Sequence, residues 1–256
     1  SGNDIIRGLN EDDTLNGGTG NDTIDGGADD DIVNGGAGDD IIIGGLGNDQ
    51  NNGGADFDTL DFSSTGIAIT IGSRGSIRKT VGGFGAGTDT NTLGIEKFVG
   101  DATQVNTLDG LLEFTVGSPD GVAAGGNAFF DVNLLEEEFV LSPEDGTAFP
   151  VTTFEVVNFS NVRGTINNDV IVGDLGENVI FGSGGNDVLD GSLGEDVLDY
   201  SEVNSTINFG DFARITVANP DDLTNTAIPL ITVDSALIIK DIGAGQSSDG
   251  VTNFET

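Results

Sequence analysis

Aspartate recurs at every ninth position through the first 61 residues of the sequence. The repeated residues are Asp4, Asp13, Asp22, Asp31, Asp40, Asp49 and Asp58. Carboxylates brought close together repel each other, and a divalent cation that prefers oxygen ligands relieves the repulsion. The spacing therefore predicts hard-cation binding as the chemistry of these residues.

Glycine and an apolar residue keep the same period. Numbering each row from its first glycine places the acid at position 6 and the apolar residue at position 8. Rows begin at Gly8, Gly17, Gly26, Gly35, Gly44 and Gly53, and position 8 holds Ile6, Leu15, Ile24, Val33, Ile42, Asn51 and Leu60. A second block begins rows at Gly164, Gly173, Gly182 and Gly191, with Asp169, Asn178, Asp187 and Asp196 at position 6. Asn51 breaks the apolar rule, so its row is expected to face solvent or to lie at a seam.

This period predicts a coil of short stacked strands. Glycines at the first two positions permit positive φ and tight turns, and the residues after the acid alternate as a strand. Nine residues make half a coil, so turns 18 residues apart stack at about the 4.8 Å spacing of paired strands. One edge then carries Asp4, Asp22, Asp40 and Asp58, and the other carries Asp13, Asp31 and Asp49.

Calcium ions between stacked acids fit this arrangement. Turn carbonyls complete an oxygen shell of about six or seven ligands, and those expected are the carbonyls of Asn3, Asn21, Asp39, Asn48 and Asn186. Counting gaps predicts about five ions in the first block and about two in the second, between Asp169 and Asp187 and between Asn178 and Asp196. Uncharged Asn178 is expected to give the weakest site. Asp31 should serve two ions, whereas Asp58, at the end of its edge, should serve one.

The rows resemble the RTX nonapeptide GGxGxDxUx of haemolysin-type calcium-binding proteins. The resemblance implies parallel β-rolls, export by a type I system and folding in external calcium. It also implies a secreted, cell-surface location, because RTX surface proteins alternate rolls with β-rich inserts.

An all-β organisation in four parts is expected: a roll over 1–61, a β-rich insert over 62–163 with a lone repeat-like turn near 100–110, a second roll over 164–199, and a β-rich segment over 200–256 leading to a further roll. Alternation at Ile67, Ile69 and Ile71 is typical of a half-buried strand. The clusters GGFGAGTDTN and SPDG are interpreted as turns. Phe62 and Tyr200 are expected to cover the last layer of each roll.

Composition limits the partners. The 256 residues include 44 Asp and Glu against 8 Lys and Arg, a formal net charge of −36, which repels nucleic acid and anionic membranes. His and Cys are absent, which disfavours zinc and soft metals. No apolar run approaches the roughly 20 residues of a membrane-spanning helix. Acidic, glycine-rich chains are often disordered, but the apolar period argues for a fold once cations are present. Ser1 falls inside a repeat, so the sequence is expected to be a segment of a longer protein.

No catalytic constellation is evident. Serine has no His to serve as its base, and no Cys nucleophile exists. Carboxylate pairs for glycoside hydrolysis stay open, but the obvious acids are assigned to calcium. Arg74, Arg78 and Lys79 could pair with acidic neighbours in this chain or another copy, or form surface ion pairs of little energy. The run Glu136–Glu138 fits a solvated turn better than a further cation site.

Two non-catalytic functions follow. One is a calcium-binding structural module of a cell-surface or extracellular-matrix protein, such as a filament, sheath, surface layer or adhesin stalk, possessing the capacity to join copies head to tail. The alternative is the calcium-folding tail of a type I-secreted enzyme or toxin. Rolls separated by β inserts favour the first.

Overall fold

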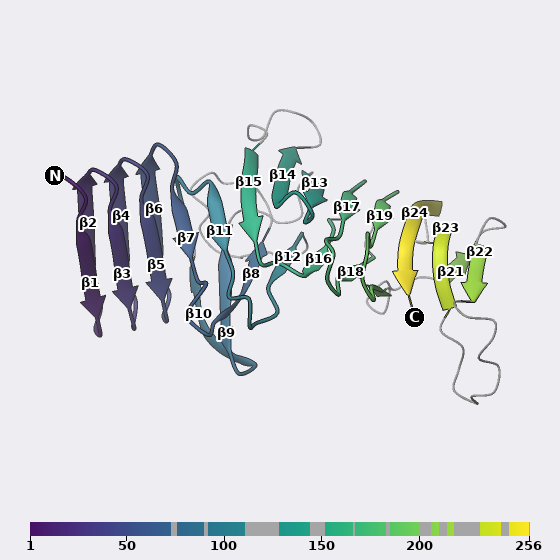
Figure 1. The fold of residues 1–256 in the computed structure, drawn as a ribbon, viewed down its shortest axis with the longest axis horizontal. Coiled ribbons are helices and arrows are strands. Elements are labelled where there is room, and N and C mark those ends of the chain that lie inside the picture. Colours follow the sequence, from purple (N-terminus) through teal and green to yellow (C-terminus); the bar gives the residue numbers. More distant parts are fainter. Residues whose placement is uncertain are drawn as a thin grey trace. The chain divides into compact units, whose positions relative to one another are not determined.

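The computed structural model describes residues 1–72, 76–89, 92–110, 128–143, 152–165, 167–182, 185–199, 206–209, 214–217, 231–241 and 246–255. Every regular element in these ranges is a β-strand (Figure 1). The chain divides into two compact units. The first holds Ser1–Ala124, Glu137–Phe139 and Thr152–Phe159, and the second holds Gly125–Glu136, Val140–Val151 and Ser160–Thr256. The strand β14 (Glu138–Pro143) has residues in both.

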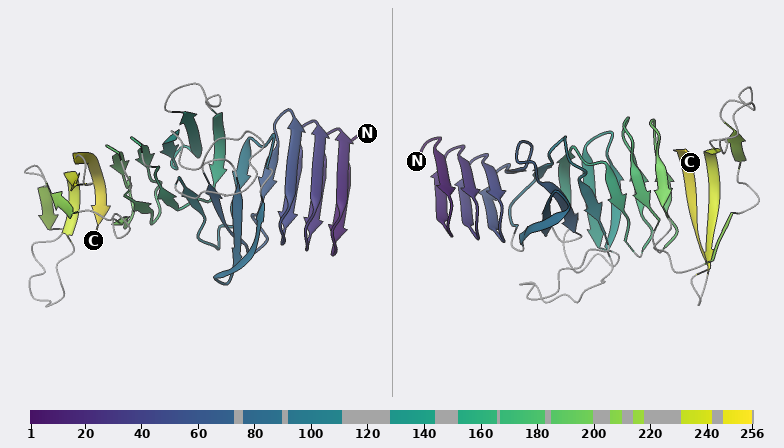
Figure 2. Two further views of the ribbon diagram at one scale, coloured as in Figure 1. Left: turned by 180° about the vertical axis from the view of Figure 1, so that it is seen from behind. Right: turned by 90° about the horizontal axis from the view of Figure 1, so that it is seen from below.

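The repeats of the first unit form a parallel β-roll. Its strands are β1 (Ile5–Leu9), β2 (Thr14–Thr19), β3 (Thr23–Gly27), β4 (Ile32–Ala37), β5 (Ile41–Gly45), β6 (Gln50–Ala55) and β7 (Thr59–Asp61). Odd-numbered strands pair in the order β1–β3–β5–β7, and even-numbered strands pair in the order β2–β4–β6. Figure 2 shows this row of strands from behind. Ile24 pairs with Ile6 and Ile42, each 18 residues away, so the predicted stacking is confirmed.

Position 8 supplies the core of the roll. Ile24, Ile42 and Leu60 are fully buried, and Val33 is 1% exposed. Burying each such side chain stabilises the fold by about 1.5–3 kcal/mol. Asn51 is also fully buried, so the expectation that its row faces solvent is wrong. The alternative, a seam, fits, because Asn51 lies where the roll meets strands of the insert.

Glycine has two different roles within a row. Positive φ occurs at positions 2 and 4, as at Gly18 (106°) and Gly20 (114°), and not at positions 1 and 2 as the sequence suggested. The first glycine is needed for space instead. A Cβ on Gly17 would lie 2.3 Å from Asp22 Oδ2 and 2.7 Å from the Gly35 carbonyl oxygen. Any larger residue would therefore collide with the acid of its own row.

The first sheet continues beyond the repeats. The strands β11 (Lys97–Val99) and β15 (Thr152–Val157) follow β7 in the same parallel register, with Phe98 opposite Leu60. Phe62 is buried, but its N–H donates to the Val99 carbonyl, so it does not cover a last layer. Tyr200 lies outside the described residues. Phe98 and Phe154 pack with ring centroids 5.6 Å apart, which extends the core past the repeats.

A second group of strands, the insert sheet, branches from this roll. It consists of β8 (Ala68–Gly72), β9 (Ile77–Val81), β10 (Phe84–Asp89) and β12 (Thr107–Asp109) in the order β10–β9–β8–β12. Gly82 and Gly83, both at positive φ, form the two-residue hairpin turn between β9 and β10. The interpretation of GGFGAGTDTN as a turn is therefore right for 82–83 and wrong for 84–89, which is a strand. SPDG lies outside the described residues.

The second unit repeats the roll on a smaller scale. Its strands are β13 (Ala128–Asn133), β16 (Asn161–Arg163), β17 (Val170–Val172), β18 (Val179–Phe181), β19 (Val188–Asp190), β20 (Val197–Asp199), β21 (Thr206–Phe209), β22 (Arg214–Val217), β23 (Ile231–Asp241) and β24 (Gln246–Glu255). The parallel pairs β17–β19 and β18–β20 again join residues 18 apart, such as Ile171 and Leu189. β24 extends the first pair, and β23 lies antiparallel to it.

Candidate metal centre

The position 6 carboxylates of the first roll form two hydrogen-bonded ladders. On one edge, the N–H of Asp4 donates to Asp22 Oδ1 over 2.7 Å, and the same contact joins Asp22 to Asp40 and Asp40 to Asp58. On the other edge it joins Asp13 to Asp31 and Asp31 to Asp49. We call these the Asp4 ladder and the Asp13 ladder. Each acid therefore has one oxygen held by the main chain of the preceding turn.

The second carboxylate oxygen is buried and lacks a hydrogen-bond donor in most rows. Among the described residues this holds for Oδ2 of Asp13, Asp22, Asp31, Asp40 and Asp58. A buried carboxylate oxygen without a donor is costly unless a cation lies beside it. The repeated, oriented oxygens therefore fit a bound cation at each turn.

Backbone geometry keeps each such oxygen close to main-chain carbonyls. The space beside Gly17 is bounded by Asp22 Oδ2 and the Gly35 carbonyl, and the space beside Gly35 by Asp40 Oδ2 and the Gly53 carbonyl. No group of three or more acids gathers around one point in the described ranges. Carbonyls must therefore supply part of any shell, and an all-oxygen shell of this kind suits Ca²⁺.

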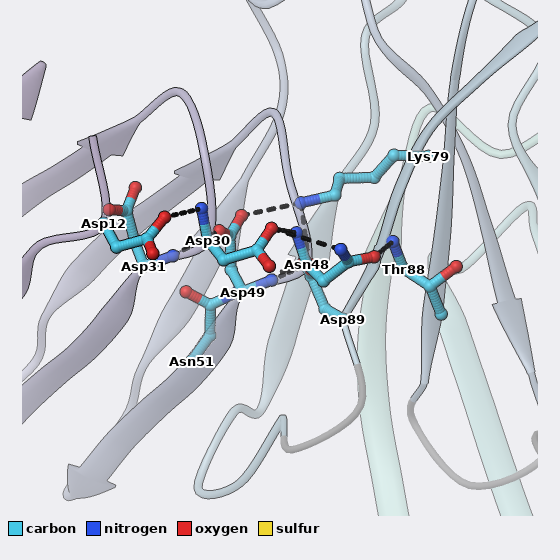
Figure 3. Close-up of polar contacts among 9 residues, drawn as sticks. All are labelled: Asp12, Asp30, Asp31, Asn48, Asp49, Asn51, Lys79, Thr88 and Asp89. Carbon is cyan, nitrogen blue, oxygen red and sulfur yellow. Dashed lines mark hydrogen bonds and ion pairs between the residues drawn. The ribbon is translucent and has the colours of Figure 1, made fainter. Parts of the chain in front are cut away.

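Lys79 marks where a cation lies in one row. Its Nζ is 2.6 Å from Asp49 Oδ2 and 2.6 Å from Asp89 Oδ1. Asp49 is thus the one acid of the Asp13 ladder, in the described structure, whose Oδ2 has a positively charged neighbour (Figure 3). The roll itself places positive charge between the acids of successive turns.

Two acids that the sequence analysis missed extend the ladders. The N–H of Asp49 donates to Asp89 Oδ1 over 2.9 Å, and the N–H of Asp58 donates to Glu96 Oε2 over 2.9 Å. Segment 85–89 reads GAGTD, a G-x-G-x-D fragment, and 94–99 reads GIEKFV with Glu in place of Asp. These fragments were the available signals, hidden because the spacing is 40 and 38 residues instead of 18.

Position 5 forms side-chain ladders of its own, in the opposite direction. The N–H of Asp30 donates to Asp12 Oδ1 and that of Asn48 to Asp30 Oδ1, and Thr88 continues the series onto Asn48 (Figure 3). On the other edge, Asn3, Asn21 and Asp39 accept from the following rows in the same way. These residues were expected to act through their carbonyls. Their side chains brace the turns, and the role of their carbonyls stays a prediction.

The second unit carries the same pattern with more of its oxygens occupied. Asp169 accepts from Thr165 N at Oδ2 and from Phe130 N at Oδ1, and its own N–H donates to Asp187 Oδ1. Asn178 donates from Nδ2 to the Ser160 carbonyl and to Asp174 Oδ1, while its N–H donates to Asp196 Oδ1. Asn186 N–H donates to Asn168 Oδ1. Protein donors thus take part of the space that a cation would use here.

Burial makes the acids of the first unit reluctant to ionise without a cation. It raises the pKa of Asp31, Asp40 and Asp49. Burial, with the nearby Asp40 and Glu96 carboxylates, raises the pKa of Asp58 to about 6. Burial also raises the pKa of Asp89 to about 7, despite the adjacent Lys79. A cation beside these oxygens would favour their charged forms.

Other sequence candidates lie apart from the ladders. Lys79 is buried, so the surface-pair interpretation is wrong for it, whereas Arg78 is exposed and Arg74 lies outside the described residues. Lys97 pairs with Glu155 at a partly exposed site. Glu136–Glu138 is exposed, as expected of a solvated turn. At the lone repeat-like turn, Asn106 takes the acid position and accepts from Ile69 N.

The described residues contain no helix long and apolar enough to cross a membrane. No curated protein matches the chain. A family model does match: residues 1–33, 25–60 and 163–198 fit the RTX calcium-binding nonapeptide repeat, found in four copies. These segments coincide with the rows whose acids form ladders and whose strands pair at 18 residues. The two blocks of this chain therefore consist of RTX calcium-binding nonapeptide repeats folded as parallel β-rolls.

Proposed function

We propose that the chain is a calcium-folded structural module of an extracellular or cell-surface protein. One observation carries the proposal: a buried Oδ2 without a donor recurs in register along both ladders, and a lysine ammonium lies beside the equivalent oxygen of Asp49. Calcium would supply the missing positive charge. Because the ion binds stacked turns and not the unfolded chain, its binding free energy becomes folding free energy.

The site residues are proposed as follows. Each ion lies between Oδ2 of one row and Oδ1 of the next, with turn carbonyls completing the shell. The Asp13 ladder holds ions between Asp13, Asp31 and Asp49. The Asp4 ladder holds ions between Asp4, Asp22, Asp40 and Asp58, and a further one between Asp58 and Glu96. This gives about six ions in the first unit. The two ions of the second unit are proposed to bind more weakly, because Asp169 and Asn178 already have protein partners.

Calcium titration of the full chain tests this function. We expect β-type circular dichroism to appear as Ca²⁺ rises into the range of about 10⁻⁴–10⁻³ M that extracellular modules use. Mg²⁺ should substitute poorly, because it demands a tighter octahedral shell. A fully folded spectrum in excess chelator, unchanged by Ca²⁺, would contradict the proposal.

The structural role is favoured over that of an enzyme or toxin tail. RTX repeats occur at both 1–60 and 163–198, and the described strands between them extend a roll instead of forming a pocket with catalytic groups. We propose that calcium-loaded copies stack end to end through edge strands, because β1 and β2 each pair on one side only within the described part of the chain. Sedimentation and electron microscopy with and without Ca²⁺ test this. Monodisperse monomers at every concentration would leave the tail as the better proposal.

A further inference from the structure

Lys79 occupies an unusual place for a lysine. It lies on β9 and points inward like Ile77, and both side chains are fully buried. Its ammonium bridges Asp49 Oδ2 and Asp89 Oδ1, each at 2.6 Å (Figure 3). Fully buried lysines are rare unless they are paired, so this geometry calls for a specific role.

The two acids around Lys79 are successive steps of one ladder. Asp89 stands to Asp49 as Asp49 stands to Asp31, because each accepts the N–H of the preceding acid at Oδ1. The ammonium therefore lies between Oδ2 of one row and Oδ1 of the next. Our proposed function places calcium in the corresponding position between Asp31 and Asp49.

The surroundings are also polar where other rows are apolar. Asn51 takes position 8, where Val33 and Leu15 stand in the preceding rows of the same sheet. Asn51 Nδ2 donates to Asp89 Oδ2 over 3.2 Å, and its buried Oδ1 has no hydrogen-bond donor among the described residues. Two carboxylates and an amide oxygen thus surround the ammonium, which is a ligand set of the kind that Ca²⁺ uses.

We propose that the Lys79 ammonium replaces a calcium ion at the end of the Asp13 ladder and fastens the insert sheet to the roll. This inference rests on the proposed function. The chain's own cation closes the ladder without external calcium, so the site between Asp49 and Asp89 is a latent divalent site. Shortening Lys79 to alanine removes the ammonium and leaves room and two unbalanced carboxylates. A divalent ion then matches their charge.

The test compares K79A with wild type and with R78A, which removes an exposed positive charge from the same strand. Calcium bound per chain is measured by equilibrium dialysis, and thermal unfolding is followed across calcium concentrations. We expect K79A to bind one more ion than wild type and R78A to bind the same number. We also expect K79A to be less stable than wild type at low calcium, with the difference shrinking as calcium rises. The double variant K79A/D89N should lose the extra ion.

Three outcomes overturn the inference. K79A binds no additional ion, its destabilisation is the same at every calcium concentration, or it stays unfolded even in saturating calcium. Each would make Lys79 an ordinary buried ion pair. Failure of the proposed function is a separate result, because wild type itself would then bind no calcium.

Discussion

The main-chain N–H of Asp58 donates a hydrogen bond to Glu96 Oε2 over 2.9 Å, although the residues are 38 positions apart. The contact reproduces the one between Asp40 and Asp58, which are 18 apart. Asp58 is therefore not the end of its ladder, and the expectation that it has a neighbouring acid on one side only is wrong. An excursion of 20 additional residues leaves the ladder intact.

Replacing Glu96 by glutamine should remove the last ion of the Asp4 ladder. Glutamine keeps a carbonyl that can accept from Asp58 N–H, but it lacks the charge that a cation needs. We expect E96Q to bind one ion fewer and to fold at a higher calcium concentration. E138Q, which neutralises an exposed acid, is the matched control. Equal calcium counts for E96Q and wild type would remove Glu96 from the site.

Asp31→Ala should raise the calcium midpoint more than Asp4→Ala. Asp31 is 1% exposed and has Asp13 and Asp49 as ladder neighbours, whereas the Asp4 side chain is 50% exposed. Removing Asp31 weakens two ions and leaves the N–H of Asp13 without its acceptor. Circular dichroism titrations of the two variants provide the comparison. The stacked arrangement of ions predicts unequal shifts, so equal ones would argue against it.

Substituting Gly17 by alanine should weaken calcium binding and destabilise the roll by about 1–3 kcal/mol, the usual cost of overpacking. The added Cβ would lie 2.3 Å from Asp22 Oδ2 and would push the carboxylate out of position. Gly85→Ala is the control, because a Cβ there meets no atom within 4 Å. Calorimetric titration and thermal unfolding should separate the two variants. Similar losses in both would mean that backbone freedom, and not space, explains the first glycine.

Calcium and protons should compete at mildly acidic pH. The pKa of Asp58 is about 6 in the folded, calcium-free chain against an ordinary value of 3.8, so protonation favours the fold. Its contribution is full below pH about 4 and is lost as pH rises through about 6. Without calcium, the chain should therefore be more stable at pH 4.5 than at 7.5. With calcium, the midpoint should rise as pH falls from 7.5 to 5.5, and D58N should show less of this rise. A midpoint independent of pH would contradict the buried acids as ligands.

The sequence predicted the roll because its information is local. A period of nine in glycine, acid and apolar residue sets the turn, the strand and the 18-residue register together, and the pairing of Ile24 with Ile42 follows from it. The insert is different. Asp89 and Glu96 enter the ladders only because the hairpin turn at Gly82 and Gly83 returns the chain to the roll. That return depends on tertiary packing, which no period encodes.

Lys79 and Asn51 illustrate the remaining gap. Read alone, Asn51 is a defect in the apolar stripe, and Lys79 is one of several surface charges. Each makes sense only beside the other's neighbour Asp89, because a polar core position and a buried ammonium satisfy the same carboxylate. A pairwise relationship between residues 28 positions apart (79 minus 51) cannot be seen from single-residue preferences.

The opposed directions of the two ladder types give the roll a preferred order of winding. A newly arrived turn finds the N–H of its predecessor ready to receive its position 6 acid, as Asp4 receives Asp22. Its own position 5 acceptor, such as Asn21, waits for the N–H of the turn that follows. Growth from the N-terminal side thus behaves like a one-dimensional lattice, with a costly first pair of turns and cheaper elongation. Each ion is captured one turn behind the advancing tip, so free calcium sets the speed of the zipper as well as its end point.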